Sequence, residues 1–224
     1  MNNDMQEKWE VLHSQSRFRP KYPSEQVVQF VFRNFKRDGN TKILDLGCGA
    51  GRHVYFMAME NIDTYGVDIS REGITNTEKT LKHAGLKARL TVGSVDVISF
   101  EDNYFDGILC YGVLYYCKKN EIEKAIDEIY RVLKIGGKGL LLVRNKNDYR
   151  FGDGKEIEKN TFIIQEENSN NSAFNENGMT MHLFERDELI KLFRKFKNVS
   201  IDEIIETYEN GKLCDSNFKV IFEK

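Results

Sequence analysis

Three glycines and two aspartates stand where a chain could hold a nucleotide-like cofactor. Gly47, Gly49 and Gly51 separate the apolar run "KILDL" from a helical pattern. Glycine lets the backbone turn sharply and approach a ligand closely, and the N–H groups at a helix start bind anionic groups. Asp68 ends the next apolar run, where an acidic side chain accepts hydrogen bonds from ribose hydroxyls. Asp45 lies inside the first run, so its carboxylate needs donors from the loop or from a cationic ligand.

Strand and helix patterns alternate along most of the chain, which predicts a parallel sheet with helices on both faces. One helix is predicted to begin after Ser24 and to end at Asp38-Gly39. Another is predicted to begin at Asn120, with Glu123 as its capping-box partner, and to end at Gly136-Gly137. The apolar runs predict strands at 42–47, 63–70, 87–94, 105–112, 138–144, 199–205 and 218–223, with further helices at 52–60, 71–84 and 185–197. We therefore expect an α/β fold with a doubly wound, mostly parallel, seven-stranded sheet.

The domain organisation predicted from these patterns is a single domain, 1–224, with two additions. Residues 1–40 form an N-terminal helical cap. Residues 145–184 are polar, asparagine-rich and irregular, which is typical of a lid or a substrate-binding insertion.

Composition narrows the classes of function. The 224 residues are 40% hydrophobic, and 33 Lys and Arg stand against 35 Asp and Glu. This balance argues against a strongly basic nucleic-acid-binding domain. The cysteines form no CxxC pair, so no metal site is expected. The opening "MNNDMQEKWE" lacks the pattern of a signal peptide and no apolar run is long enough to cross a bilayer, so we expect a cytoplasmic protein without membrane contact.

Four stretches in order resemble class I, Rossmann-like S-adenosylmethionine-dependent methyltransferases of the small-molecule type: "ILDLGCGAG", "GVDIS", "FDGILCYGVLYY" and "EIYRVLKIGGKGLLLV". The resemblance implies S-adenosyl-L-methionine as cofactor. It places the glycines, Cys110 and Tyr111 near the methionine part, Asp68 on the ribose, and Ser94 near the adenine, where family members often have Asp. An NAD enzyme is disfavoured, because dinucleotide motifs usually read GxGxxG. The cofactor-binding candidates are Asp45, Gly47, Cys48, Gly49, Asp68, Ile69, Ser94, Val95, Cys110 and Tyr111.

The acceptor is inferred from what surrounds these motifs. "CYGV" after the fourth strand differs from the Asn-Pro-Pro-Tyr-like motif of adenine enzymes, and Cys110 lacks the preceding proline of cytosine enzymes. We therefore expect methyl transfer to oxygen or nitrogen of a small metabolite, which is anionic, phosphate-bearing or like a sugar nucleotide, if Arg144 binds it. Arg144 ends the fifth strand, where it either holds an anion or pairs with acidic residues of the following loop. The candidate substrate-binding residues are Arg19, Tyr22, Arg144 and His182, and the candidate catalytic residues are His182, preferred over His13 as base, and Tyr22.

Two other functions stay open at this stage. One is a protein that binds S-adenosylmethionine without chemistry, and the other is a protein or RNA methyltransferase whose acceptor docks on the irregular segment. The sequence leaves the oligomeric state open, and a homodimer is one arrangement that it allows.

Overall fold

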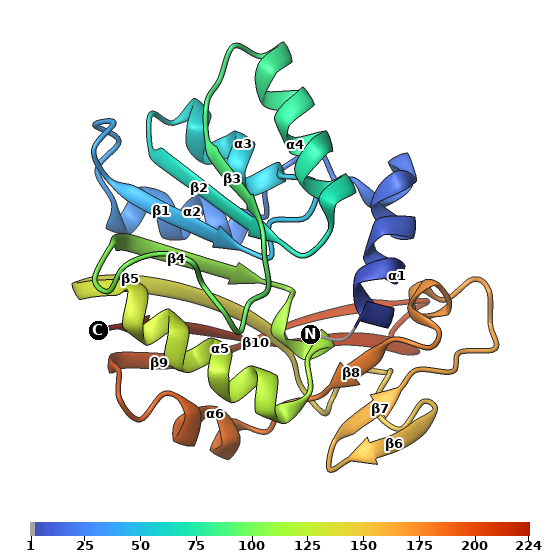
Figure 1. Cartoon of the computed structure of the whole chain (residues 1–224). Coiled ribbons are helices and arrows are strands. Elements are labelled where there is room, and N and C mark those ends of the chain that lie inside the picture. The colour runs from blue at the N-terminus through green and yellow to red at the C-terminus, as the bar shows by residue number, and fades with distance from the viewer. Residues whose placement is uncertain (1–2) are drawn as a thin grey trace.

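A twisted seven-stranded sheet runs through the middle of the molecule (Figure 1). The computed structural model describes residues 3–224. The strand order is β3-β2-β1-β4-β5-β10-β9, in which β10 pairs antiparallel with both β5 and β9 and the other neighbours are parallel. The strands are β1 Lys42–Leu46, β2 Asp63–Asp68, β3 Arg89–Val92, β4 Phe105–Tyr111, β5 Leu133–Arg144, β9 Lys197–Tyr208 and β10 Leu213–Glu223. The predicted fold class is confirmed.

Helices cover both faces of this sheet, because successive strand residues point to opposite sides. In β1, Ile43 packs with the core of α2 and α3, whereas Leu44 and Leu46 pack on the other side with α5 and α6. The helices are α1 Asn3–Ser14, α2 Glu25–Asn34, α3 Arg52–Met59, α4 Arg71–His83, α5 Lys119–Val132 and α6 Arg186–Leu192, with 3-10 turns η1 Ser16–Phe18, η2 Leu114–Tyr116 and η3 Ser172–Glu176. Within residues 3–224, no helix combines the length and the apolar character needed to cross a membrane.

The start of α5 differs from the sequence prediction. Asn120 lies inside the helix, and the cap position belongs to Lys118, whose backbone N–H donates to the Glu121 carboxylate at 2.9 Å. The sequence has glutamates at both 121 and 123, and it is the side chain of Glu121 that turns back to the start of the helix. The helix also ends earlier than predicted, because β5 begins at Leu133 and runs through Gly136 and Gly137.

The segment 145–184 is more ordered than predicted. It contains a small antiparallel sheet of β6 Lys155–Glu158, β7 Thr161–Ile163 and β8 Thr180–His182, which lies beside the main sheet (Figure 1). Strands of three or four residues are too short to show a clear alternation of apolar and polar residues. Asparagine is common throughout the segment, so it does not mark where the individual turns lie. The role of this segment as a lid stays a prediction.

Candidate functional site

A cavity of about 290 Å³ opens at the carboxyl ends of β1, β2 and β4. This edge is where open α/β sheets bind ligands. Its floor is the glycine loop 47–51 together with Asp68 and Tyr111, and its roof includes Trp9 and His13 of α1 and Phe18 of η1. Segments far apart in the sequence therefore enclose one site.

The glycine loop needs its glycines. Gly47 has φ +79°, and a Cβ there would lie 2.4 Å from Cγ2 of Val113. The N–H groups of Gly47 and Cys48 donate to the Val67 carbonyl at 2.7 and 3.0 Å, which fixes the loop to β2. No side chain caps α3 after Gly51, so the first N–H groups of this helix stay available to an anionic group.

Asp68 is held rigidly beside the loop. Its Oδ2 accepts from the N–H of Gly49 at 2.7 Å, and its Oδ1 accepts from the N–H of Ser70 at 2.8 Å. Burial raises the pKa of Asp68, and these two hydrogen bonds and the nearby His13 offset only part of that effect. A carboxylate fixed in this way presents acceptor lone pairs to the cavity that it lines.

Asp45 is buried beneath the loop, with one oxygen unsatisfied. Its Oδ2 has no hydrogen-bond partner among the described residues and lies 3.9 Å from Nδ1 of His53, which lines the cavity. A buried carboxylate oxygen without a donor is costly. It therefore suits a ligand that carries a positive charge or donors.

Helix α1 closes the site through a contact with α4. Both carboxylate oxygens of Glu10 accept hydrogen bonds at the start of α4: from the N–H of Arg71 and of Glu72, each at 2.8 Å, and from the Ser70 hydroxyl at 2.9 Å. These donors directly follow Asp68 in the chain. Glu10 thus ties the roof of the cavity to the turn that orients Asp68.

Comparison with known proteins agrees with this geometry. Residues 43–137 match the model of a family described as a methyltransferase domain. Residues 43–137 thus form a methyltransferase domain, and the fold is the class I, Rossmann-like fold of S-adenosylmethionine-dependent methyltransferases. A S-adenosylmethionine-dependent methyltransferase from Methanosarcina mazei superposes with a TM-score of 0.70 at 24% identity, covering 87% of this chain and 96% of that one. One from Clostridium acetobutylicum gives a TM-score of 0.63 at 16% identity, covering 97% and 91%.

The curated relatives are longer proteins. An uncharacterized protein of Methanocaldococcus jannaschii is 31% identical over 120 residues, 54% of this chain and 48% of its own length. The 24-methylenesterol C-methyltransferase 2 of Arabidopsis thaliana is 36% identical over 98 residues, 42% of this chain and 27% of its own length. The match thus spans about half or less of the length of these relatives.

The cofactor of this family, S-adenosylmethionine, suits the residues present. The uncapped start of α3 fits its carboxylate, and Asp68 fits its ribose hydroxyls. The described residues bring together no cluster of three or more His, Cys, Asp or Glu side chains that could hold a metal ion.

Most of the predicted cofactor residues of the methyltransferase line the cavity. Three of them do not line it. Asp45 is buried beneath the loop, and the Ser94 hydroxyl donates to Asp96. Cys110 is fully buried in β4, where burial raises the pKa of its thiol. Those that line it are Gly47, Cys48, Gly49, Asp68, Ile69, Val95 and Tyr111.

Of the two candidate bases, His13 lines the cavity and His182 does not. His182 is fully buried away from the cavity, where Nδ1 lies 2.8 Å from the Thr161 hydroxyl and Nε2 lies 3.1 Å from the Glu188 carboxylate. It therefore joins β7, β8 and α6 and does not meet a substrate there. His13 lines the cavity and stacks on Trp9 at 5.4 Å between ring centroids. Burial lowers the pKa of His13, against the attraction of Asp68 and Glu10.

The other substrate candidates also lie outside the cavity lining. Tyr22 is 73% exposed, and Arg19 donates to Oδ1 of Asn76 at 2.7 Å and to the Ser14 carbonyl at 2.8 Å. Arg144 donates to Oδ2 of Asp148 at 2.7 Å. Of the two roles considered for Arg144, the structure shows the ion pair with the following loop.

Sequence reasoning predicted the helical cap 1–40 and named His13 as second choice for a base, but it did not name Trp9. Trp9 and His13 are one helical turn apart and both line the cavity. Their spacing of four residues was the available signal, since it places two aromatic rings on one face of a helix.

We expect Glu10→Gln to lower the thermal stability. Helix caps contribute about 0.5–2 kcal/mol, and for a chain of this size each kcal/mol is about 2–4 °C in Tm. Burial raises the pKa of Glu10, but its donors at Glu72, Arg71 and Ser70 outweigh burial and lower it overall. A lowered carboxyl pKa stabilises the fold near neutrality and loses that effect as the pH falls through the folded-state pKa.

Thermal unfolding of wild type and Glu10→Gln from neutral to acidic pH tests this expectation. The difference in Tm should be largest near neutrality and disappear in acid. Glu7→Gln, an exposed acid on the same helix, is the control and should leave Tm unchanged. Equal Tm values for Glu10→Gln and wild type at pH 7 would contradict the capping role.

Proposed function

We propose that this chain transfers a methyl group from S-adenosylmethionine to oxygen or nitrogen of a small molecule. The observation that carries the proposal is the cavity itself, where the glycine loop, Asp68 and the start of α3 face a roof made by α1. The bound cofactor supplies an activated methyl: the bond from acceptor to carbon forms as the carbon–sulfur bond breaks, and the bonding pair stays on sulfur. The acceptor then loses its proton to solvent or to a base.

A small acceptor is favoured by the size and cover of the site. The cavity volume of about 290 Å³ lies just below the range of ligand sites, about 300–1,000 Å³, and the cofactor would fill part of it. Trp9, His13 and Phe18 line it on the side of α1 and η1. A folded macromolecule would have to displace this roof to present its reacting atom.

The expected negative charge of the acceptor has lost its basis. It rested on Arg144, which is buried and bound to Asp148. Phosphate-bearing and sugar-nucleotide acceptors are therefore no longer favoured.

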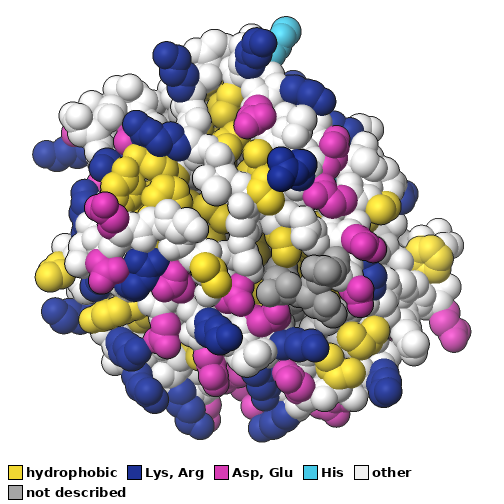
Figure 2. Space-filling model, viewed as in Figure 1, with side chains coloured by type: hydrophobic (Ala, Val, Ile, Leu, Met, Phe, Trp, Pro, Cys, Tyr) yellow, Lys and Arg dark blue, Asp and Glu magenta, His cyan; other side chains and the backbone are white. Residues whose placement is uncertain are grey.

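A protein or RNA acceptor and a binding protein without chemistry are the alternatives. On the face shown in Figure 2, basic and acidic side chains are intermixed. This face therefore offers no extended patch of one charge to bind an RNA strand or a charged protein tail. The cytoplasmic location and the homodimer stay predictions.

Thermal unfolding with S-adenosylmethionine, S-adenosylhomocysteine and NAD tests the cofactor. A ligand at 100 times its Kd adds about 2.7 kcal/mol, so we expect a clear rise in Tm with the first two and none with NAD. Formation of S-adenosylhomocysteine in a pool of small metabolites then tests the chemistry. Binding without turnover on metabolites, but with turnover on macromolecular extract, would favour a protein or RNA acceptor. Binding without any turnover would favour a binding protein.

A further inference from the structure

The cavity has two chemically different ends. The charged side chains that line it, Arg52 and Asp68, belong to the glycine-loop end, and His13 reaches from α1 to the glycine loop with its ring stacked on Trp9. The wall made by η2, α1 and η1 is aromatic and carries no full charge. We call this surface the aromatic wall; its residues are Trp9, Phe18, Tyr115 and Tyr116.

The rings of the aromatic wall pack in a defined geometry. The Trp9 and Tyr116 centroids are 4.9 Å apart with the rings nearly perpendicular, and those of Tyr115 and Tyr116 are 4.4 Å apart. The edge-to-face contact of Trp9 with Tyr116 is a preferred arrangement of aromatic pairs. Ring contacts thus fix Trp9, Tyr115 and Tyr116 relative to one another, although Trp9 lies more than 100 positions before the two tyrosines.

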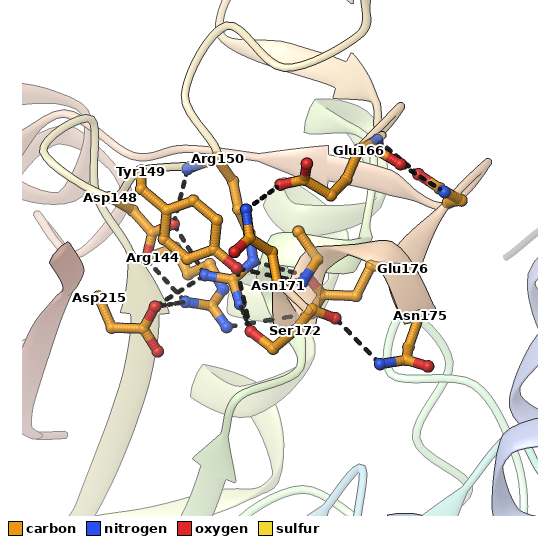
Figure 3. Close-up of polar contacts among 12 residues, drawn as sticks. Arg144, Asp148, Tyr149, Arg150, Glu166, Asn171, Ser172, Asn175, Glu176 and Asp215 are labelled. Carbon is orange, nitrogen blue, oxygen red and sulfur yellow. Dashed lines mark hydrogen bonds and ion pairs between the residues drawn. The ribbon is translucent and has the colours of Figure 1, made fainter. Parts of the chain in front are cut away.

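A buried charge cluster, whose residues are drawn in Figure 3, contacts two rings of the aromatic wall. The Tyr116 hydroxyl donates to Oε1 of Glu176 at 2.6 Å, and the Arg144 guanidinium lies over the Tyr115 ring, 5.1 Å from its centroid. The charge cluster consists of two guanidinium groups and three carboxylates, from Arg144, Arg150, Asp148, Glu176 and Asp215. Both arginines are engaged, and the cluster carries one more negative charge than positive.

These contacts decide which acceptors the aromatic wall can hold. An anion seated there would leave water without gaining a cationic partner from the wall, because Arg144 behind it is bound to Asp148 and Arg17, 4.6 Å from the Phe18 ring centroid, does not line the cavity. It would face the negative faces of aromatic rings and the excess carboxylate behind them. A neutral molecule has no such cost, and a cation gains from the same rings.

We infer that the methyl acceptor is a small apolar molecule without negative charge, neutral or an amine, that binds against the aromatic wall. The inference rests on the proposed function and names its substrate class. Tyr116 acts as a positioning residue, because its hydroxyl anchors the aromatic wall to Glu176.

The test uses three fragments with one ring and different charges: benzyl alcohol, benzylamine and benzoate. Trp9 is the chain's single tryptophan and belongs to the aromatic wall, so its fluorescence reports binding there. The protein is first saturated with S-adenosylhomocysteine, and failure of that step would refute the proposed function independently of this inference. We expect benzyl alcohol and benzylamine to bind at least ten-fold more tightly than benzoate. Benzoate binding as tightly as either would overturn the inference.

Two variants sharpen the result. Phe18→Arg places a cation in the partly exposed roof of the cavity and should raise the affinity for benzoate while lowering that for benzylamine. Tyr116→Phe keeps the ring and removes the bond to Glu176, so we expect several-fold weaker binding of benzyl alcohol with unchanged affinity for S-adenosylhomocysteine. Tyr130→Phe on α5, outside the cavity lining, is the matched control. Equal loss of both ligands in Tyr116→Phe would mean general damage and would contradict a positioning role.

Discussion

Asp68→Asn should lower the affinity for S-adenosylmethionine and S-adenosylhomocysteine by roughly 100-fold. The variant keeps the size of the side chain and removes its charge. Hydrogen bonds to charged groups contribute about 1.5–3 kcal/mol each, and the ribose would offer two hydroxyls to this carboxylate. The substitution also weakens the bond from the Gly49 N–H, which holds the glycine loop at 2.7 Å. Calorimetric titration with S-adenosylhomocysteine measures the effect directly.

The pH dependence of the same titration separates charge from shape. Burial raises the pKa of Asp68, so its carboxylate protonates at a higher pH than an ordinary aspartate does. The ribose hydroxyls need the ionised form as acceptor, so wild-type affinity should fall as the pH is lowered through this pKa. Asp68→Asn cannot titrate and should lack this fall. Asp63→Asn, at the opposite end of β2, is the control that should behave as wild type, and a similar loss in both variants would refute the ribose role.

The part of the site built from local sequence was predictable, because its signals are contiguous. The apolar run before Gly47 and the one that ends at Asp68 are neighbouring parallel strands, so their carboxyl ends had to meet. Gly47 and Asp68 needed no knowledge of the rest of the chain. The glycine at position 47 is required by a positive φ and by the close approach of Val113, which the sequence signals only as a loop.

The roof and the aromatic wall depend on contacts that no local pattern encodes. Glu10 caps a helix that begins 61 positions later, and nothing in "KWEVLH" indicates which helix that is. The partner of Arg144 could likewise not be predicted from the sequence. Its place at the end of a strand was evident, but whether Asp148 would reach it, four residues on, depended on how the loop turned. His182 was misplaced because β8 joins the small sheet and buries the ring against Glu188.

Arg150→Met should cost about 3–5 kcal/mol of folding free energy, the usual cost of removing one partner of a buried ion pair. Only 1% of the Arg150 side chain is exposed, and it bonds Glu176 at 2.6 Å, Asp215 at 2.9 Å and Asp148 at 3.0 Å. Burial by itself would lower the pKa of Arg150, but the surrounding carboxylates raise it well above its ordinary value. Met has a similar length and no charge, so the variant leaves three carboxylates facing Arg144 alone. Denaturant unfolding in buffer of fixed ionic strength measures the loss.

A second substitution shows whether the loss comes from unpaired charge or from packing. In Arg150→Met with Asp215→Asn, one carboxylate fewer stands uncompensated, so the double variant should recover part of the stability and be less destabilised than the two single effects added together. Arg194→Met, an exposed arginine after α6, should stay within about 0.5 kcal/mol of wild type. A cost below 1 kcal/mol for Arg150→Met would mean that the charge cluster does not hold the segment 145–184 to the sheet. In that case Glu176 would no longer be a fixed partner for Tyr116, and the aromatic wall would need another explanation for its geometry.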